Sequence, residues 1–393
     1  MQQKGQKVYT TQFWLLCASS TLFFASFNMI IPELPDYLTR LGGEDYKGLF
    51  ISLFTLTAGL SRPFSGKLAD KVGRIPVMII GSVVCVICGL LYPVLSTVLG
   101  FLLLRFFHGF STGFKPTGTT SYVADIVPTH RRGEAMGVIA FCGTFGMALG
   151  PAIGSEIAAQ FSTIVMFYCS SVLALFSVLV LIGMKETLQN RHQPSLSLLK
   201  ISKDDVYEPR VLAPAIVMMF AVFSFGMILT IIPDFSVHLG IKNKGLFYTY
   251  FTVASLLIRF LAGKASDRFG REVVLKISSF TMVIAMTFLG LVDSYAGFII
   301  GAVLFGIATG MNSPIIFAWT IDLSHEKHRG RAMATVYIAL EIGIGCGAFF
   351  SALILNNDPS RFTITFWTGA LMSLIAFSYL VYHTRSKRHL INS

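Results

Sequence analysis

Charged side chains are scarce in this chain. Only 13% of its 393 residues are Asp, Glu, Lys or Arg, whereas 54% are hydrophobic. Soluble domains carry about 25% charged residues, so this chain lacks the polar surface that a water-soluble globule needs. The scarcity therefore excludes an ordinary soluble enzyme. It also excludes a disordered chain, because disordered chains are rich in charge and poor in apolar residues.

Chemically reactive groups are also sparse. The chain has six cysteines and eight histidines, and they do not form clusters. Cys85 and Cys88 have the spacing of a zinc or redox motif, but they lie in an apolar stretch without His or acidic neighbours. The sequence contains neither a nucleophile triad nor the Gly-rich loop that cradles nucleotide phosphates. We therefore predict no metal, no cofactor, no use of ATP and no enzymatic activity.

Long apolar stretches make up most of the chain. A bilayer core of about 30 Å takes about 20 helical residues, and stretches of this length recur twelve times. They lie near 14–37, 47–66, 76–95, 98–122, 134–158, 162–184, 211–236, 245–263, 274–293, 296–321, 332–355 and 362–383. The predicted fold class is an all-α membrane protein with 12 transmembrane helices.

The net charge of +11 is distributed unevenly between the two sides of the predicted spans. The loops of one side hold only five of the 31 Lys and Arg residues, namely Arg40, Lys47, Lys242, Lys244 and Arg361. Basic loops stay in the cytoplasm, so the basic side is cytoplasmic. We predict a multi-pass protein of the cell inner (plasma) membrane with both termini in the cytoplasm and no nucleic-acid partner.

One pattern occurs twice along the chain. A shift of 197 residues aligns segment 66–74 with segment 263–271 and Arg62 with Arg259. We interpret both arginines as residues of the cytoplasmic boundary. The repeat indicates two six-helix bundles in parallel orientation, an arrangement that secondary transporters use. We expect an N-terminal bundle over 1–186, a cytoplasmic linker over 187–210 and a C-terminal bundle over 211–393.

The segment 66–74 carries a family resemblance. Its pattern Gly-x-Leu-Ala-Asp-Lys-x-Gly-Arg resembles the loop between the second and third helices of the major facilitator superfamily, and the copy at 263–271 falls where the second half requires it. The chain resembles this superfamily over its full length and is most similar to the 12-helix drug or metabolite:proton antiporter branch. In such transporters this loop latches the cytoplasmic side when the cavity faces outward. The resemblance assigns this gate to Gly66, Asp70, Gly73, Arg74, Asp125, Asp267, Arg271 and Asp322.

Elementary chemistry gives the same signature a structural meaning. Gly66 and Gly73 permit a tight turn and a close helix approach. Asp70 can place a carboxylate at the N-terminus of a neighbouring helix, where the helix dipole favours negative charge. We also expect Arg74 to pair with Asp125.

A second pattern lies in the fifth predicted span. It consists of Gly137, Gly146, Gly150, Pro151 and Gly154. It resembles the fifth-helix pattern of antiporters of the superfamily, with Ser155 where that pattern often has a further glycine. Small residues allow helices to pack closely, and the proline removes a helix hydrogen bond. The pattern favours export.

Ionisable residues within the predicted spans are the candidates for substrate binding. Each costs about 2.5–3.5 kcal/mol at the bilayer centre by insertion scales, so each needs a partner or a function. We predict that Arg105, His108, Lys115 and Glu341 bind the substrate. Arg105 and His108 belong to an Arg-Phe-Phe-His-Gly element that resembles the Arg-x-x-Gln-Gly element of proton-coupled members. Two cations on one half that face a carboxylate on the other suit an anionic or zwitterionic solute.

Three carboxylates are candidates for carrying a coupled proton. Glu33 and Asp36 lie at the outer end of the first span, in a segment that resembles an element of drug:proton antiporters. Glu341 lies near the middle of the eleventh span. Glu33 and Asp36 can also be solvated acids at a loop edge, so the sequence leaves the proton carrier open.

Together these features predict a secondary active transporter in the lipid bilayer. We expect a monomeric, proton-coupled exporter of small amphiphilic, anionic or zwitterionic organic compounds or drugs, which works by alternating access. The first alternative is a proton-coupled importer of a sugar or organic anion on the same fold. An integral-membrane enzyme acting on lipid head groups and a channel are disfavoured, because no reactive residues share a cytoplasmic loop outside the gate signatures and the repeat contains no pore loop.

Overall fold

The computed structural model describes residues 9–128, 131–189, 191, 193, 207–324 and 329–392. Within these ranges every regular element is a helix, which confirms the all-α class. Most of the predicted linker 187–210 lies outside the described residues.

The helices follow the order of the predicted spans. The N-terminal half contains α1 (Thr11–Ile30), η1 (Ile31–Glu33), α2 (Leu34–Arg40), η2 (Glu44–Tyr46), α3 (Leu49–Lys71), α4 (Arg74–Leu91), α5 (Val98–Ile126), α6 (Arg132–Gln160) and α7 (Thr163–Ile182). The C-terminal half contains η6 (Pro209–Val211), α8 (Leu212–His238), α9 (Leu246–Phe269), α10 (Arg271–Leu289), α11 (Tyr295–Leu323), α12 (Arg329–Leu355), η8 (Pro359–Arg361) and α13 (Phe362–Asn392).

Hydropathy gives fewer membrane spans than the twelve predicted from the sequence. In the part of the chain that the structure describes, nine helical segments are long and apolar enough to cross a membrane, and bent α9 makes ten if it counts as one span. The helices α3 and α5 fall below this criterion, because Arg62 in α3 and Arg105 and Lys115 in α5 lower their hydropathy. The predicted count of 12 is thus not confirmed by this measure.

Local sequence determines where several helices begin. The side-chain oxygens of Thr10, Thr97 and Ser294 accept hydrogen bonds from first-turn amides of α1, α5 and α11, as N-capping residues do. Gly73 joins α3 to α4 with a φ of 144°, and its repeat counterpart Gly270 joins α9 to α10 with a φ of 93°. Glycine adopts this conformation without steric cost, so the first signature loop turns within Val72 and Gly73 and the second within Gly270 alone.

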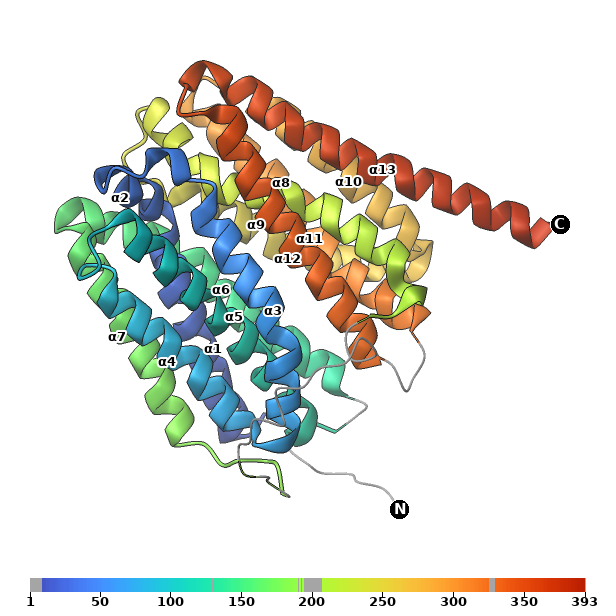
Figure 1. Cartoon of the computed structure of the whole chain (residues 1–393). Coiled ribbons are helices and arrows are strands. Elements are labelled where there is room, and N and C mark those ends of the chain that lie inside the picture. Colours follow the sequence, from blue (N-terminus) through green and yellow to red (C-terminus); the bar gives the residue numbers. More distant parts are fainter. Residues whose placement is uncertain are drawn as a thin grey trace.

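The two halves repeat the same packing, which confirms the parallel repeat. Helix α1 packs on α6 as α8 packs on α12, and α5 packs on α3 and α4 as α11 packs on α9 and α10. Figure 1 shows the N-terminal half (blue to green) beside the C-terminal half (yellow to red), with the last turns of α7 and α13 far apart. Between the halves α3 contacts α12 and α6 contacts α9.

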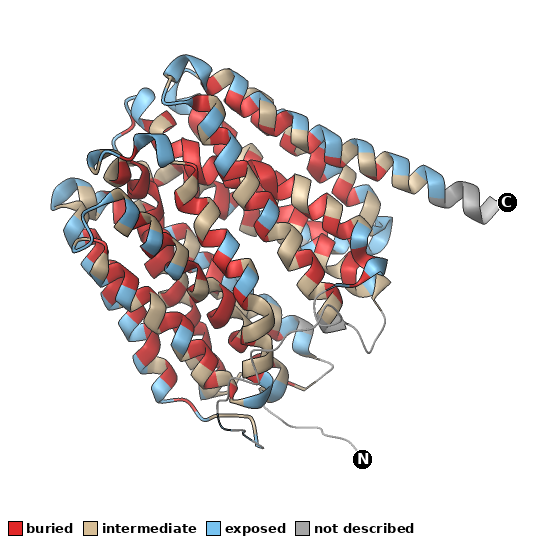
Figure 2. Cartoon of the chain, viewed as in Figure 1, coloured by how far each residue is buried: buried red, intermediate tan, exposed pale blue. Residues whose placement is uncertain are grey.

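The helix surfaces are suited to lipid. Leu99, Leu257 and Leu261 are 68%, 68% and 66% exposed, and Figure 2 shows exposed positions recurring along the outer helices. Exposed apolar surface on this scale marks contact with another apolar phase. Buried aromatic residues such as Phe101 and Phe298 fill the interior of each half.

Candidate functional site

A charged clasp joins the two halves at the end where α2 and the loop 239–245 lie, which the charge asymmetry predicts to be the outer end. Lys244 Nζ donates to Glu33 Oε2 at 3.0 Å and also to Asp36. Burial lowers the pKa of Lys244, but the two carboxylates outweigh burial and raise that pKa above its usual value. Ser155 Oγ donates to Glu33 Oε1 at 2.8 Å. Glu33, Asp36 and Lys244 form the outer clasp.

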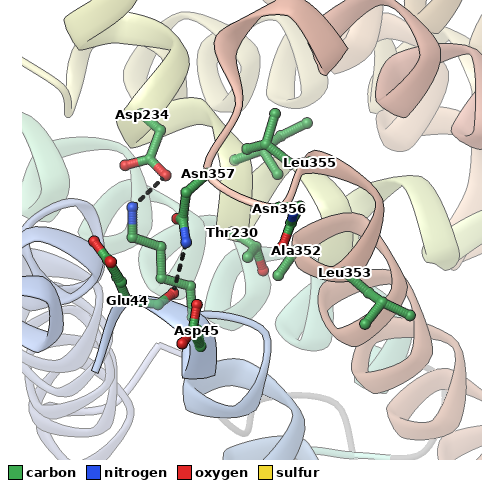
Figure 3. A pocket seen from close by; sticks show the side chains of 11 residues that line it. Glu44, Asp45, Thr230, Asp234, Ala352, Leu353, Leu355, Asn356 and Asn357 are labelled. Carbon is green, nitrogen blue, oxygen red and sulfur yellow. Dashed lines mark hydrogen bonds and ion pairs between the residues drawn. The ribbon is translucent and has the colours of Figure 1, made fainter. Parts of the chain in front are cut away.

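A second ion pair lies beside the outer clasp. Lys47 Nζ donates to Asp234 Oδ2 at 2.8 Å, and Asn357 Nδ2 donates to the backbone carbonyl of Glu44 at 3.3 Å. Figure 3 shows both contacts at a cavity of about 220 Å³ between η2 and the helices α8 and α12. These contacts strengthen the closure of this end.

Backbone atoms complete the closure of the outer end. Ser52 Oγ of α3 donates to the carbonyl of Gly345 in α12 at 2.8 Å. Gly245, the N-cap of α9, lies so close to α6 that a Cβ atom there would collide with the carbonyl of Pro151. We call these two contacts the main-chain seam. The first contact needs the Ser52 hydroxyl, and the second needs a glycine at position 245 because the backbones approach so closely.

One ion pair links the halves deeper in the molecule. Arg62 of α3 donates to Glu341 Oε1 of α12, through Nη2 at 2.8 Å and through Nε at 3.3 Å. The Cζ atom of Arg62 also lies 4.3 Å from the centre of the Tyr337 ring. Glu341 is only 8% exposed. Our interpretation of Arg62 as a boundary residue is therefore wrong, because its guanidinium binds a buried carboxylate of the other half.

The repeat counterpart of this pair lacks a carboxylate. The shift of 197 residues that aligns Arg62 with Arg259 also aligns Thr144 with Glu341. Arg259 Nη1 donates to Thr144 Oγ1 at 3.5 Å, the limit of a hydrogen bond, and the buried Nε has no partner among the described residues. Arg259 lines a cavity of about 170 Å³ between α6 and the C-terminal helices. It too is no simple boundary residue.

Arg105 and His108 lie inside the N-terminal bundle, and each is 1% exposed. Arg105 Nε donates to the carbonyl of Phe50 at 2.8 Å, and Arg105 Nη1 donates to the hydroxyl of Tyr92 at 3.3 Å. The same hydroxyl lies 3.1 Å from His108 Nδ1. The structure thus brings Arg105 and His108 together through a buried tyrosine.

Lys115 is also 1% exposed and lies in the same bundle. Its ammonium group donates to the hydroxyl oxygens of Ser19 in α1 and Ser177 in α7. Glu341 has Arg62 as its partner, so the structure does not bring the α5 cations together with this carboxylate. The expected arrangement of two cations facing Glu341 is absent from this conformation, because α5 packs against helices of its own half.

The glycine signature forms a charged cluster within the N-terminal half. Arg74 Nη1 donates to Asp70 Oδ1 at 2.7 Å and Arg74 Nε donates to Asp125 Oδ2 at 3.1 Å. Glu186 accepts from the backbone amides of Arg74 and Ile75 at 3.1 and 2.9 Å. The pairing of Arg74 with Asp125 is confirmed. The carboxylate at the N-terminus of α4, however, belongs to Glu186 and not to Asp70.

The two signature glycines differ in what they require. Gly73 has a positive φ, so its predicted turn is confirmed. A Cβ atom on Gly66 would meet nothing within 4 Å, so the expected close approach at Gly66 is wrong.

The second copy repeats the cluster in the C-terminal half. Arg271 Nε donates to Asp322 Oδ2 at 3.1 Å, and Arg271 Nη1 donates to Asp267. Asp322 and Asp267 are 53% and 69% exposed, so solvent screens these pairs. The carboxylates of the C-terminal cluster are therefore well placed to exchange partners at low cost, whereas Asp125 of the N-terminal cluster is only 30% exposed.

Three of the four glycines in the α6 pattern are required by packing. A Cβ atom on Gly150 would lie 2.6 Å from the carbonyl oxygen of Ala25, and Gly146 and Gly154 face the α1 backbone in the same way. Gly137 has open space around it. The close packing predicted for this pattern thus holds from Gly146 onward.

In the ranges that the structure describes, no group of three or more His, Cys, Asp or Glu side chains is arranged to hold a metal ion. The sequence analysis did not predict that Lys244 pairs with Glu33 and Asp36, or that Lys47 pairs with Asp234, because the partners in each pair lie far apart in the chain. The alignment of Thr144 with Glu341 was the one available signal for the Arg259 site.

Two repeated bundles, joined at one end and by a buried ion pair, define the class of a two-domain secondary transporter. A sequence model described as Major Facilitator Superfamily matches residues 16–242 and 214–392. The chain therefore belongs to the major facilitator superfamily, a family of membrane transporters and not of enzymes. It is a multi-pass membrane protein.

Individual relatives support this assignment. The chain is 25% identical over 283 residues to "Multidrug resistance protein 2" of Bacillus subtilis (strain 168), covering 69% of this chain and 70% of the relative. It is 26% identical over 294 residues to "Quinolone resistance protein NorA" of Staphylococcus aureus (strain MRSA252), covering 72% and 74%.

Solved structures share the fold at low identity. A D-xylose-proton symporter has a TM-score of 0.77 at 17% identity, covering 94% of this chain and 96% of that one. The human organic anion transporter MFSD10 has a TM-score of 0.72 at 17% identity, covering 95% and 100%. These likenesses concern the fold alone.

Proposed function

We propose that this protein is a proton-coupled exporter of small amphiphilic organic compounds, including drugs. The observation that carries the proposal is the buried ion pair between Arg62 and Glu341, which joins the two halves. Relatives named for multidrug and quinolone resistance support export. The glycine pattern of α6, which resembles that of antiporters, points the same way. No observation favours the importer alternative.

Transport proceeds by movement of the two halves against each other. The moving units are the bundles over 1–186 and 211–393, connected by the linker 187–210. In the present conformation the outer clasp and the main-chain seam join the halves at the end that we assign to the outside. Release of substrate to the outside requires Lys244 to leave Glu33 and Asp36. The clusters around Arg74 and Arg271 then latch the cytoplasmic end.

Glu341 is our first choice for the proton carrier. Its carboxylate is buried and its partner belongs to the other half. Protonation removes the negative charge, and a buried cation that loses its partner costs about 3–5 kcal/mol. Proton binding at Glu341 is thereby coupled to separation of α3 from α12. Glu33 and Asp36 can play the same part at the outer clasp.

The setting follows from the charge distribution and the fold. We propose that the protein lies in the plasma membrane with both termini in the cytoplasm. One chain is the working unit, because a single chain supplies both halves of the pathway. Its partners are a small-molecule substrate, protons and the surrounding lipid bilayer.

The test is proton movement in proteoliposomes. A pH-sensitive dye inside the vesicles reports proton flow when a quinolone or another amphiphilic compound is added under a proton gradient. We expect substrate-dependent proton flow in the wild type and a loss of about tenfold or more in Glu341→Gln, which corresponds to about 1.4 kcal/mol of lost coupling. The matched control is Asp293→Asn, an exposed acid between α10 and α11. Substrate export without proton flow refutes the proposal.

A further inference from the structure

The two arginines at the boundary between the halves have unequal surroundings. Arg62 and Arg259 are repeat counterparts, and so are the residues opposite them, Glu341 and Thr144. Arg62 binds Glu341 through two nitrogen atoms at 2.8 and 3.3 Å. Among the described residues, Arg259 donates a hydrogen bond to the Thr144 hydroxyl alone, at 3.5 Å. The repeat therefore provides two equivalent positions for a carboxylate, and the chain itself fills one of them.

The space beside Arg259 is a cavity of about 170 Å³ at the boundary between the halves. Arg259 is the one charged side chain among the described residues that line it. Its walls are largely apolar and include Met147 of α6 and Phe225 and Phe251 of the C-terminal half. A cavity with apolar walls and one cation suits a ligand with an aromatic or aliphatic body and a single negative charge.

Two polar groups in this cavity are without partners in the described part of the chain. They are Arg259 Nε and the hydroxyl of Thr252, a residue that is 2% exposed. Buried polar groups that lack hydrogen bonds are rare in proteins, and a guanidinium stays charged at any physiological pH. An anion in the cavity would provide acceptors for both groups.

We propose that this cavity is the substrate site and that it binds the acid group of an amphiphilic monoanion on Arg259, in the position that Glu341 occupies at Arg62. This inference rests on the proposed function and specifies its substrate class. The planar guanidinium binds a carboxylate through two parallel hydrogen bonds, and the Thr252 hydroxyl donates a further one. The apolar body of the substrate packs against Phe225 and Phe251.

Binding of three probes with one ring system tests the charge preference. The probes are 1-naphthoate, neutral 1-naphthamide and cationic 1-naphthylmethylammonium, titrated calorimetrically into the purified full-length protein in lipid nanodiscs. We expect naphthoate to bind tightest. Arg259→Gln should weaken naphthoate by about tenfold or more, as loss of a charged hydrogen bond does, and change naphthamide by less than about twofold. Arg259→Lys keeps the charge but not the fork geometry and should fall between.

A second variant tests the repeat argument independently. Thr144→Glu copies the arrangement of Glu341 opposite Arg62 and gives Arg259 an internal carboxylate. We expect it to weaken naphthoate binding as much as Arg259→Gln does while naphthamide binding persists. Because this change adds a partner to a buried cation, the variant should unfold at a temperature no lower than the wild type.

The outcomes separate this inference from the proposed function. Equal naphthoate affinity in the wild type and Arg259→Gln, or tighter binding of the cationic probe, overturns the anion site. Arg259-dependent naphthoate binding without substrate-driven proton flow in proteoliposomes supports the anion site and refutes proton-coupled export. Proton-driven export that is equal in the wild type and in Arg259→Gln supports the proposed function and refutes the anion site.

Discussion

Replacing Gly150 by alanine should destabilise the N-terminal bundle, whereas the same change at Gly137 should not. Both glycines lie in α6 and belong to the same sequence pattern. A Cβ atom on Gly150 would lie 2.6 Å from Ala25 O and 3.2 Å from Ala25 Cα. These are backbone atoms of α1, so they cannot rotate away. A Cβ atom on Gly137 would meet nothing within 4 Å.

The magnitudes follow from two opposing effects. Alanine in place of a mid-helix glycine gains about 0.5–1 kcal/mol. Overpacking of a close helix contact costs about 1–3 kcal/mol. We therefore expect Gly137→Ala to leave stability unchanged or raise it by up to about 1 kcal/mol. Gly150→Ala should lower it by about 1–2 kcal/mol, because the steric cost exceeds the gain.

The assay is reversible unfolding in mixed detergent micelles, followed by the fluorescence of the three tryptophans, of which Trp14 lies at the start of α1. Both variants carry the same added methyl group, so their difference isolates the contact between α1 and α6. If Gly150→Ala proves as stable as Gly137→Ala, the packing of these helices differs from that described above.

Three further predictions concern charged groups. Lys244→Gln should open the outer clasp. A cysteine placed at Thr230, which lines the cavity of about 220 Å³ beside the clasp, should then react with an impermeant maleimide about tenfold faster if one charged contact is lost. Unchanged labelling would contradict the clasp. Because the pKa of Lys244 is raised, its contribution is complete below the usual lysine pKa of about 10.4 and is lost only at higher pH. The ratio of the labelling rates with and without Lys244→Gln should therefore stay flat from about pH 7 to 9, since the thiol at position 230 titrates in both proteins and its effect cancels. Arg74→Ala, which removes contacts to Asp70 and Asp125, should slow transport by about tenfold, whereas Lys71→Ala at an exposed position should have little effect; equal losses would argue against a specific latch. Ser177→Ala removes an acceptor from buried Lys115 and should lower the free energy of unfolding by about 1–3 kcal/mol, and an unchanged unfolding curve would show that the ammonium group finds another partner.

Much of the fold could be predicted from the sequence. The apolar stretches locate the helices because each helix must satisfy its backbone hydrogen bonds internally in lipid. The signature and its repeat place Arg74, Asp125, Arg271 and Asp322 among the gate residues, and the structure pairs each of these arginines with an aspartate from that set.

The partners across the two halves were harder to predict. The pairing of Arg62 with Glu341 joins residues that are 279 positions apart, and the clasp of Lys244 with Glu33 joins residues 211 apart. Neither helical periodicity nor local spacing contains information on such contacts. For the same reason the hydroxyl groups around Lys115 could not be foreseen, since they come from α1 and α7.

The main-chain seam has a consequence for how such a transporter can change. Gly245 faces the carbonyl of Pro151, and Ser52 donates to the carbonyl of Gly345. A new side chain at Gly245 would push the halves apart, so almost no other residue can replace this glycine. The wall of the cavity beside Arg259 contains large side chains such as Phe225 and Met147, which can be exchanged one at a time. Adaptation to new compounds should therefore accumulate in that wall and leave the joint between the halves untouched.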